Sequence, residues 1–489
     1  MFRSPLLAAV LAIPTGVGHA TGPLLVADGR FDEWAALLPS HVDPTGDAAP
    51  IDFGRLWVGS NAEWVTLRLE VGAEINLQGH NAISIAIDGD DDPATGCERG
   101  QLGAELVWTF GERSGMHCRK GFEGRIGQGD FGLETAPTVS SSEFEISFRR
   151  RRGDGTALLP GPVVSLVIRD GSGDAGDRLP DGDAVVRVTL SDEPPPSPPA
   201  TSLERLDPDD LRVLTWNVRF DGLFHRPAAF LRVLRAIDPD IVCFQEVWRH
   251  TSQQSADQVA LALPHADWHA AAAVEGHIVS RYPFHSEAAI DPSGNYWAWI
   301  DLPDDRYGAD LSIVNAHPPC CEKEQQRQDE LDGIAAWVRE LRVPGGYEVP
   351  VRTPTVIAGD MNLVGRADQL QTILAGRIAD EQTHGPPFHP DWDGTPLADA
   401  DPYRTNGLSN STWRNPGGEF SPGKLDYILY SDSVLQRKNR FVLDTTRLSP
   451  ENLDRYGLQG EDTDIASDHL PVVADFTLVA GPTGTARGE

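Results

Sequence analysis

Polar and apolar residues alternate in short runs along the first part of the chain. Residues 81–88 alternate, and further short strand-like runs follow at 104–110, 144–148 and 163–170, with Gly or Asp residues between them. Successive side chains of a strand point to opposite faces of a sheet, so this alternation predicts strands with one buried face. Many short strands without a long helical period predict an all-β sandwich.

After residue 203, strand-like runs alternate with helical periods. The apolar strand-like runs cover residues 211–220, 239–248, 311–317, 353–362, 424–431 and 470–476. Apolar residues at helical spacing mark two helices, at 224–237 and 324–342. Strands that alternate with helices predict an α/β sandwich, and ligand sites in such folds tend to lie at strand ends.

A stretch rich in Pro and Ser, SDEPPPSPPATS at 191–202, separates the two patterns. This composition is typical of an extended, semi-rigid spacer. We therefore predict four segments after the N-terminus, which are a β-sandwich domain at 21–190, a linker at 191–203, an α/β domain at 204–480 and a flexible tail at 481–489.

The first 20 residues have the features of a secretory signal. Arg3 precedes a short apolar run at 6–13, and the small residues Gly18 and Ala20 have the spacing of a cleavage site. No later stretch of the sequence reaches the roughly 20 continuous apolar residues of a membrane span. We predict a secreted protein, either extracellular or periplasmic.

Five cysteines fit an exported protein, in which disulfides are permitted. Cys97 and Cys118 lie in the same early region, and we predict that they pair. Cys243 lies in an apolar run and is predicted to be a small buried residue. For the neighbours Cys320 and Cys321, free thiols, a vicinal disulfide and a ligand role all remain open.

The 489-residue chain is strongly acidic, with a formal net charge of −32. This balance argues against broad electrostatic binding to nucleic acid or to an anionic membrane. It does not exclude a nuclease, because a bound divalent cation can supply the local positive charge.

Polar residues recur at the ends of the predicted strands in the second part. They are Asn217, Glu246, His317, Asp360, Asn362, Asp426, Asp468 and His469. Carboxylates gathered at one place repel one another unless cations compensate them. Oxygen-rich sites of this kind favour Mg²⁺ or Mn²⁺, and histidines beside them can transfer protons near neutral pH.

The motifs TWNVR, QEVW, NAH, GDMN, KLDYIL and SDHLPV carry these residues in order. Over residues 210–478 the chain resembles the endonuclease/exonuclease/phosphatase superfamily, which includes deoxyribonucleases, apurinic endonucleases, sphingomyelinases and inositol polyphosphate phosphatases. The resemblance, closest to the deoxyribonuclease and sphingomyelinase branches, implies a four-layer α/β sandwich of two packed sheets flanked by helices. It also implies hydrolysis of phosphodiester bonds with a divalent metal.

The resemblance implies a metal site built on three of these residues. Glu246 matches the principal metal ligand, Asn217 the amide that supports metal and phosphate, and Asp468 a carboxylate on the metal side. Arg219 stands where some members carry an acidic residue. That departure removes one expected ligand, and it adds a cation suited to contact phosphate.

The resemblance also implies the residues of the chemical step. His469 matches the general base that activates water, and Asp426 the acid that orients it. His317 matches a histidine near the leaving group. Asp360 and Asn362 match the pair that orients the nucleophile and the phosphate oxygens.

Two stretches of the first part, DGRFDEW at 28–34 and IDGDDDPATG at 87–96, resemble the carbohydrate-binding-like modules of exported bacterial enzymes. The resemblance implies a polysaccharide or cell-surface ligand. Asp88, Asp90 and Asp92 either converge on Ca²⁺ or form an acidic, solvated turn.

Three functions follow from these patterns. The first, which we favour, is a secreted metal-dependent nuclease acting on DNA or RNA. The second is the same chemistry on a phospholipid head group or another small phosphoester. The third is an inert binding protein, disfavoured because each matched catalytic position holds a competent residue. Trp297 and Trp299 share one strand face, which favours core packing over lipid contact.

Overall fold

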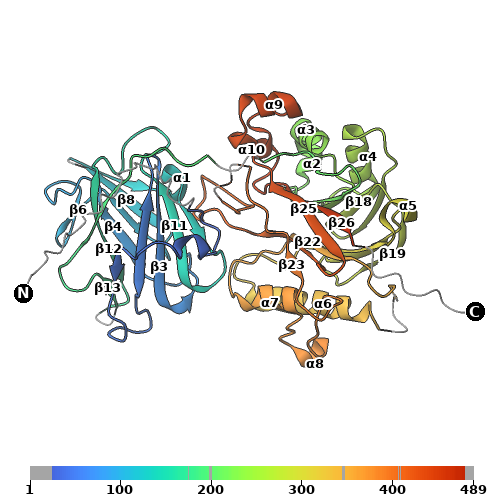
Figure 1. Ribbon diagram of the computed structural model, residues 1–489, viewed down its shortest axis with the longest axis horizontal. Coiled ribbons are helices and arrows are strands. Elements are labelled where there is room, and N and C mark those ends of the chain that lie inside the picture. The colour runs from blue at the N-terminus through green and yellow to red at the C-terminus, as the bar shows by residue number, and fades with distance from the viewer. Residues whose placement is uncertain are drawn as a thin grey trace, which may run out of the picture.

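The computed structural model describes residues 25–479, apart from 120, 174–175, 198–200, 344–346, 348, 406 and 408. The predicted signal at 1–20 and the predicted tail at 481–489 lie outside these residues. The chain forms two parts side by side, a sandwich of strands and a larger α/β part (Figure 1). Within the described residues, no helix combines the length and the apolar character needed to cross a membrane.

The first part consists mainly of two antiparallel sheets. One has the order β1-β2-β3-β11-β10, and the other has the order β13-β12-β4-β7-β8-β9 with β14 also paired to β12. The strands are β1 (His41–Val42), β2 (Arg55–Ser60), β3 (Trp64–Ile75), β4 (Ile83–Asp88), β7 (Leu106–Thr109), β8 (Ser114–Arg119), β9 (Phe122–Ile126), β10 (Glu134–Ala136), β11 (Ser141–Arg149), β12 (Val163–Asp170), β13 (Arg178–Leu179) and β14 (Val186–Thr189). A small hairpin joins β5 (Cys97–Arg99) to β6 (Leu102–Ala104), and α1 (Gln128–Phe131) follows β9.

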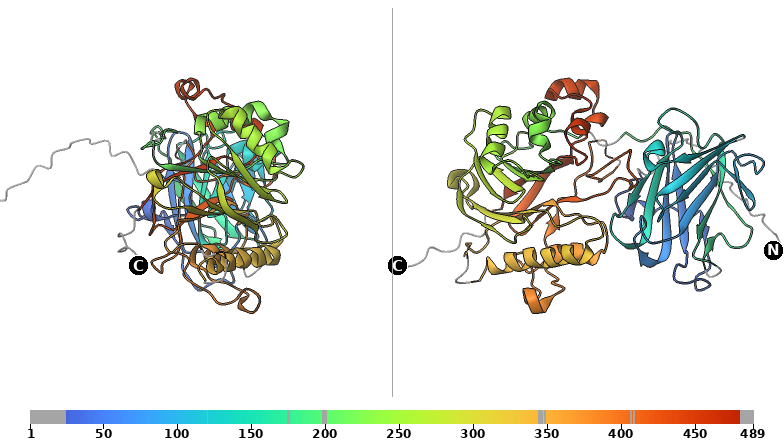
Figure 2. Two further views of the ribbon diagram at one scale, coloured as in Figure 1. Left: turned by 90° about the vertical axis from the view of Figure 1, so that its right-hand side faces the viewer. Right: turned by 180° about the vertical axis from the view of Figure 1, so that it is seen from behind.

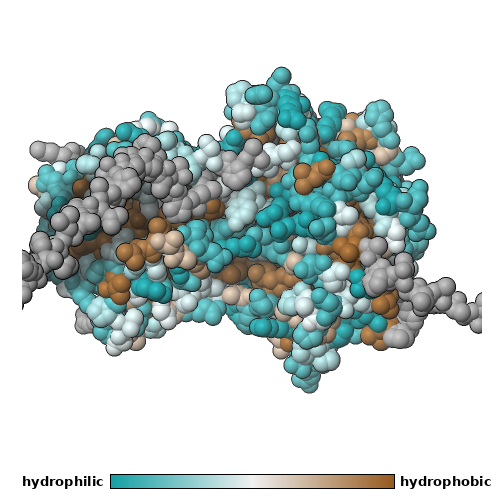
Figure 3. Space-filling view, viewed as in Figure 1, coloured by the Kyte–Doolittle hydropathy of each residue, from teal (hydrophilic) through white to brown (hydrophobic). Residues whose placement is uncertain are grey.

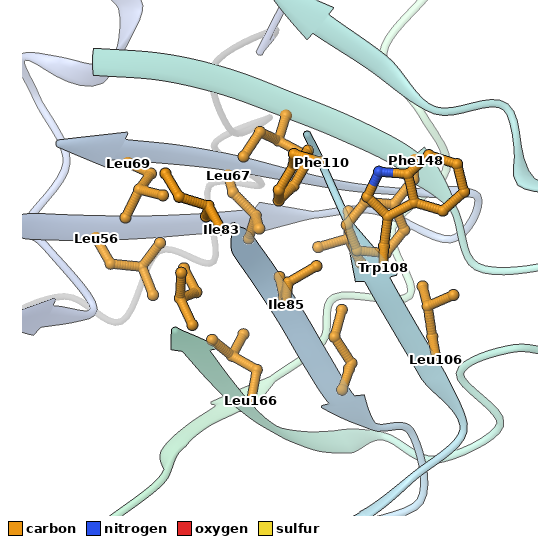
Figure 4. Packing of buried hydrophobic residues seen from close by; sticks show 14 of the residues in the cluster. Leu56, Leu67, Leu69, Ile83, Ile85, Leu106, Trp108, Phe110, Phe148 and Leu166 are labelled. Atoms are coloured by element: carbon orange, nitrogen blue, oxygen red, sulfur yellow. The ribbon is translucent and has the colours of Figure 1, made fainter. Parts of the chain in front are cut away.

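One apolar core fills the space between these sheets. Alternate residues of β4, Ile83 and Ile85, meet Leu67 and Leu69 of the facing strand β3 (Figure 4). Every second side chain along these strands points inward, which is the pattern that the sequence displays. The predicted all-β sandwich is therefore confirmed.

The second part contains two six-stranded mixed sheets. Their orders are β17-β18-β16-β15-β26-β25 and β19-β20-β21-β22-β24-β23. The strands are β15 (Leu211–Asn217), β16 (Ile241–Gln245), β17 (His269–Ala273), β18 (Gly276–Ser280), β19 (Phe284–Ala289), β20 (Tyr296–Ile300), β21 (Leu311–Ala316), β22 (Thr355–Asp360), β23 (Ala398–Asp399), β24 (Asp426–Tyr430), β25 (Leu435–Val442) and β26 (Val472–Leu478). Both sheets mix parallel and antiparallel neighbours.

Helices cover the outer face of each sheet (Figures 1 and 2). The first sheet carries α2 (Gly222–His225), α3 (Pro227–Ile237), α4 (Ser252–Ala262), α9 (Pro450–Tyr456) and α10 (Asp462–Ala466). The second carries α6 (Glu324–Glu340), α7 (Asp368–Ala375) and α8 (Glu381–His384), while α5 (Asp304–Tyr307) connects β20 to β21. The helix predicted at 224–237 is divided at Arg226, because a residue before proline avoids helical geometry.

Residues of one strand belong to different hydrophobic cores. Leu211 and Val213 of β15 pack between the two sheets, whereas Leu214 and Trp216 pack against the helices. On the second sheet, Ile357 belongs to the core beneath α6. Two sheets with helices on both outer faces make four layers, so the predicted α/β sandwich is confirmed.

Hydrogen bonds join the two parts directly. The Thr135 and Ser421 hydroxyls lie 2.9 Å apart, and the Gln128 amide donates to the Asn415 carbonyl at 2.7 Å. Leu203, at the end of the predicted linker, is buried in the helix-side core of the α/β part. The face seen in Figure 3 is largely hydrophilic, in keeping with the acidic composition.

A buried ion pair joins neighbouring strands of the first α/β sheet. Arg212 of β15 binds Asp475 of β26 through two hydrogen bonds of 2.6 and 2.7 Å. Arg212 also donates to the carbonyls of Leu203 and Ile237. The pair therefore ties the start of the domain to both the sheet and α3.

We expect Arg212→Met to lower the free energy of unfolding by about 3–5 kcal/mol, because it leaves the buried Asp475 carboxylate unpaired. The double variant Arg212→Met/Asp475→Leu should recover most of this loss. Urea unfolding followed by fluorescence measures both. Arg455→Ala, which breaks a surface pair with Glu204, is the control and should change stability little. A double variant no more stable than Arg212→Met would contradict this account.

Candidate active site

The predicted site residues meet at one edge shared by the two α/β sheets. Asn217 ends β15 opposite Gln245, the last residue of the parallel strand β16, and Glu246 follows directly. On the other sheet, Asp360 ends β22 opposite Asp426. The two sheets stack face to face, so their strand ends place these side chains together.

Asp360 lies at the centre of the site. Its Oδ2 atom is 3.0 Å from Asn217 Nδ2, 3.5 Å from His469 Nε2 and 3.6 Å from His317 Nε2. The carboxylate is almost fully buried. One side chain therefore connects an amide from the first sheet with both histidines.

Gly359 allows Asp360 to approach its neighbours. Its φ of 152° and its packing leave no room for a side chain, because an added Cβ would lie 1.9 Å from the Ala316 carbonyl oxygen. Glycine tolerates such close backbone contact. Steric exclusion of a side chain thus explains why glycine precedes Asp360 in the GDMN motif.

His469 is fixed by Asp426. Its Nδ1 lies 2.9 Å from Asp426 Oδ2, and the amide of Asp426 donates to the hydroxyl of Thr412 at 2.9 Å. Burial raises the pKa of Asp426. Burial alone would lower the pKa of His469, but the Asp426 and Asp360 carboxylates raise it to about 10. The imidazole therefore holds the proton of this pair.

His317 has an equivalent partner that the sequence did not suggest. Its Nδ1 lies 2.8 Å from Oε1 of the buried Glu275, whose Oε2 accepts the Glu246 amide at 2.5 Å. Burial opposes protonation of His317, but Glu275, Asp360 and Glu246 raise its pKa to about 9. Each histidine thus has a carboxylate at Nδ1 and directs Nε2 toward Asp360.

Glu246 is held beside Asn217 by hydrogen bonds rather than by a cation. Its Oε1 accepts from Asn217 Nδ2 at 3.0 Å, and its Oε2 accepts from the Phe220 amide at 2.9 Å. Its φ of 63° is unusual for a residue with a side chain. Such backbone geometry persists where the surroundings impose it, often at functional sites.

The donor set fits a hard divalent cation. Glu246, Asn217, Asp360 and Asp468 offer carboxylate and amide oxygens, which Mg²⁺ and Mn²⁺ prefer. Ligand atoms of Asp360, Asp426 and His469 lie within 4.8 Å of one another. Of the four oxygen-bearing residues, Glu246, Asn217 and Asp468 are the ones that would hold the metal, and Asp360 lies beside them, 3.0 Å from Asn217 Nδ2.

Asn362 and Arg219 border the same site. The Asn362 amide group donates to the Pro318 carbonyl at 3.0 Å, and its backbone N–H donates to Asp360 Oδ1 at 3.1 Å. Arg219 Nε lies 3.6 Å from Asp468 Oδ2, and almost half of the Arg219 side chain is exposed. Asn362 is thus held rigidly, whereas Arg219 faces solvent at the mouth of the site.

A segment from the domain junction supports the His469 side of the site. Trp413 pairs with Gly423 and with His469, the Leu470 amide donates to the Thr412 carbonyl, and the Arg414 amide donates to the Asp468 carbonyl. The Lys424 amide at the end of this segment donates to Thr138 of the β-sandwich at 2.9 Å. The sandwich therefore contacts the segment that packs against His469.

The acidic turn of the β-sandwich brings its carboxylates close together. Asp88 and Asp90 both accept the Asp92 amide, and Asp92 accepts the Ala94 amide. Glu105, which the motif did not include, joins them through the Thr95 hydroxyl at 2.9 Å. These contacts suit a closed turn, and calcium binding stays a prediction.

The cysteines occupy three different situations. Cys97 and Cys118 form a disulfide, and so do the neighbours Cys320 and Cys321, close to His317 in sequence. Cys243 is free and buried between the two α/β sheets.

Comparisons with known proteins extend over the same part of the chain. A model of the Endonuclease/Exonuclease/phosphatase family matches residues 214–469, just over half of the sequence. No curated protein matches.

Several solved structures are similar to a part of this chain. D. rerio TDP2 complexed with single-strand DNA product is 18% identical, with 55% of this chain and 98% of that chain covered and a TM-score of 0.35. The human Nocturnin catalytic domain with bound sulfate is 16% identical, with 56% and 97% covered and a TM-score of 0.36. ANGEL2, described as a 2',3'-cyclic phosphatase, has the same values in complex with adenosine-2',3'-vanadate.

The His317–Glu275 pair predicts a pH-dependent contribution to stability. The folded pKa of about 9 lies above the ordinary 6.5. The contribution is therefore fully present below pH 6.5 and is lost as pH rises through about 9. Glu275→Gln should lower this pKa, so in EDTA its stability deficit against wild type should be largest near pH 6 and shrink by pH 10. Chemical unfolding at several pH values measures the difference.

The matched control is Asp329→Asn, which removes the carboxylate from a surface pair with His384. Its effect should be small at every pH. A Glu275→Gln deficit that is independent of pH would contradict the assigned pairing.

Proposed function

Because the chain belongs to the Endonuclease/Exonuclease/phosphatase family, we propose that it is a divalent-metal-dependent phosphodiesterase that cleaves nucleic acid. The observation that carries the proposal is the pair of carboxylate-bound histidines, His469 with Asp426 and His317 with Glu275, on the two sides of Asp360. Phosphodiester hydrolysis needs one group to take a proton from water and another to protonate the leaving oxygen.

His469 is the candidate for the base. Asp426 accepts the hydrogen bond from Nδ1, so Nε2 is the atom that would face the reacting water. Although burial lowers it, the Asp426 and Asp360 carboxylates raise the pKa of His469 to about 10. A bound divalent cation would lower this pKa, so that Nε2 could take the proton. His317, with a pKa of about 9, is protonated at neutral pH and is suited to donate to the leaving oxygen. Asp360 lies between both Nε2 atoms and can orient the water and both rings.

Mg²⁺ or Mn²⁺, held by Glu246, Asn217 and Asp468, would neutralise charge on the phosphate and lower the pKa of the groups beside it. Asn217 already bonds both Glu246 and Asp360, so it couples the metal residues to the proton-transfer residues. The exposed guanidinium of Arg219 is placed to contact a phosphate oxygen.

The described residues favour nucleic acid over lipid as the substrate. Trp297 is fully buried and its indole N–H donates to the Ser312 hydroxyl, so it is unavailable to a membrane. Trp299 is also partly buried, in the core beneath α6. A sphingomyelinase-like or small-phosphoester activity is the alternative outcome of the activity test.

Export is part of the proposal. It is supported by the signal-like composition of residues 1–20 and by the Cys97–Cys118 disulfide, since such bonds persist in oxidising compartments. The β-sandwich would then hold the enzyme at a polysaccharide or cell surface.

N-terminal sequencing of the exported protein should show a chain beginning at Thr21. Recovery of the full-length chain from the cytoplasm alone would contradict export.

The test of the proposed activity is hydrolysis with Mg²⁺ on DNA, RNA and sphingomyelin in parallel. His469→Ala should lower the rate on the cleaved substrate by about 10²- to 10⁴-fold, because proton transfer from water loses its base. EDTA should abolish activity, and added Mg²⁺ or Mn²⁺ should restore it. Leu261→Ala, an exposed change on α4, is the control. Full activity in His469→Ala would refute the assigned base.

A further inference from the structure

Two exposed aromatic side chains flank Glu246. Phe220 is 68% exposed and Trp248 is 49% exposed, although both lie within the α/β part. With Asp221, His225 and Arg249 they line a hollow of about 370 Å³. Large apolar side chains gathered around a hollow usually mark a binding surface.

The backbone holds Phe220 in this exposed position. Arg219, Phe220 and Asp221 all have positive φ, at 47°, 50° and 60°. The Phe220 amide donates to Glu246 Oε2, and the Asp221 amide donates to the Glu246 carbonyl at 2.9 Å. Three consecutive left-handed residues are costly for side-chain-bearing residues, so the fold maintains a strained turn that places an aromatic ring beside the candidate metal ligand.

One arginine lines the hollow. It is Arg249, and Arg219 and Arg226 adjoin the lining residues Phe220 and His225 in the chain, where Arg226 donates to the Arg219 carbonyl at 2.9 Å. The carboxylate of Asp221 is buried and already accepts from the Arg249 amide and from His250. Arg249 is therefore the lining residue that can place a positive charge on a ligand phosphate.

Aromatic rings among arginines suit a particular ligand chemistry. Single-stranded nucleic acid binds through bases stacked on aromatic side chains and phosphates placed on cations. Two aromatic rings can also enclose a quaternary ammonium group, as in a choline head group. Here the Arg249 guanidinium would repel that ammonium group, so a neutral ring with a flanking phosphate fits better.

We propose that Phe220 and Trp248 form a stacking subsite for a nucleobase next to the scissile phosphate. The ligand is a single-stranded or locally unpaired segment, because a paired base does not expose its faces to two side chains. This inference rests on the proposed phosphodiesterase function and specifies its substrate. The subsite acts through binding and takes no part in proton transfer.

The first experiment compares two substrates of equal length and charge. One is a single-stranded oligodeoxynucleotide, and the other is its abasic analogue with tetrahydrofuran in place of every nucleoside. Trp248→Ala should lower kcat/KM on the oligodeoxynucleotide by roughly 5- to 100-fold, the usual effect of losing one stacked base. On the abasic analogue the change should stay below about twofold, and Trp248→Phe should retain most activity because a ring remains.

The matched control is Phe122→Ala, which removes a similarly exposed aromatic ring (44%) from the β-sandwich. This variant should leave kcat/KM unchanged on both substrates. An equal loss on both substrates in Trp248→Ala would overturn the proposal, because it would mean that the variant disturbs Glu246 rather than a base contact. Unchanged kcat/KM on the oligodeoxynucleotide in Trp248→Ala and Phe220→Ala would also overturn it.

A binding measurement separates the subsite from the activity. In a His469→Ala background, fluorescence anisotropy with a labelled single-stranded oligonucleotide should show at least about tenfold weaker binding when Trp248→Ala is added. This binding measurement tests the subsite even when the protein cleaves none of the substrates. An absence of cleavage would refute only the proposed function. Binding that is independent of Trp248, or a Trp248-dependent binding to sphingomyelin vesicles instead, would overturn the nucleobase proposal.

Discussion

The site depends on one buried carboxylate, that of Asp360. It lies at the end of the second sheet and hydrogen-bonds to Asn217 at the end of the first. Both histidines direct Nε2 toward it, and each is held from behind by another carboxylate. Burying several carboxylates is costly without compensating positive charge, which protonated imidazoles supply here and the proposed divalent cation would supplement. The four-layer packing is what brings these strand ends within reach of one another.

The same arrangement links the two parts of the chain. The segment that contacts His469 and Asp426 also reaches the β-sandwich through Thr138 and Thr135. A base is useful only when it is held within a fraction of an ångström of its productive position. The sandwich therefore supports the catalytic geometry as well as presenting a separate surface of its own.

The strand-end pattern was sufficient to predict most of the site. It identified Asn217, Glu246 and Asp360 because they end or directly follow strands that reach a common edge, and the motifs identified Asp426 and His469 at or just before the start of antiparallel strands. Glu275 was missed because it lies in the short turn between β17 and β18, where no motif marked it. A search for buried acids before antiparallel strands would have found it. The hollow beside Phe220 could not be predicted from the sequence either. It depends on a turn with three positive φ values and on exposed aromatic side chains, and the hydrophobic pattern indicates neither.

The acidic composition predicted weak binding to polyanions, yet two arginines lie near Glu246, with Arg219 beside Asp468 and Arg249 in the hollow that Phe220 lines. The two observations agree because electrostatic interactions in salt solution act only over a short distance. Charges separated by more than about 8–10 Å are largely screened at ordinary ionic strength, so a distant carboxylate contributes little to the potential at Arg219 or Arg249. In the proposed function, the few guanidinium groups near the candidate metal site would therefore determine how a phosphate is held. The net charge of −32 instead limits long-range attraction, which disfavours tight, nonspecific coating of a long duplex and leaves recognition to short-range contacts at the reacting strand.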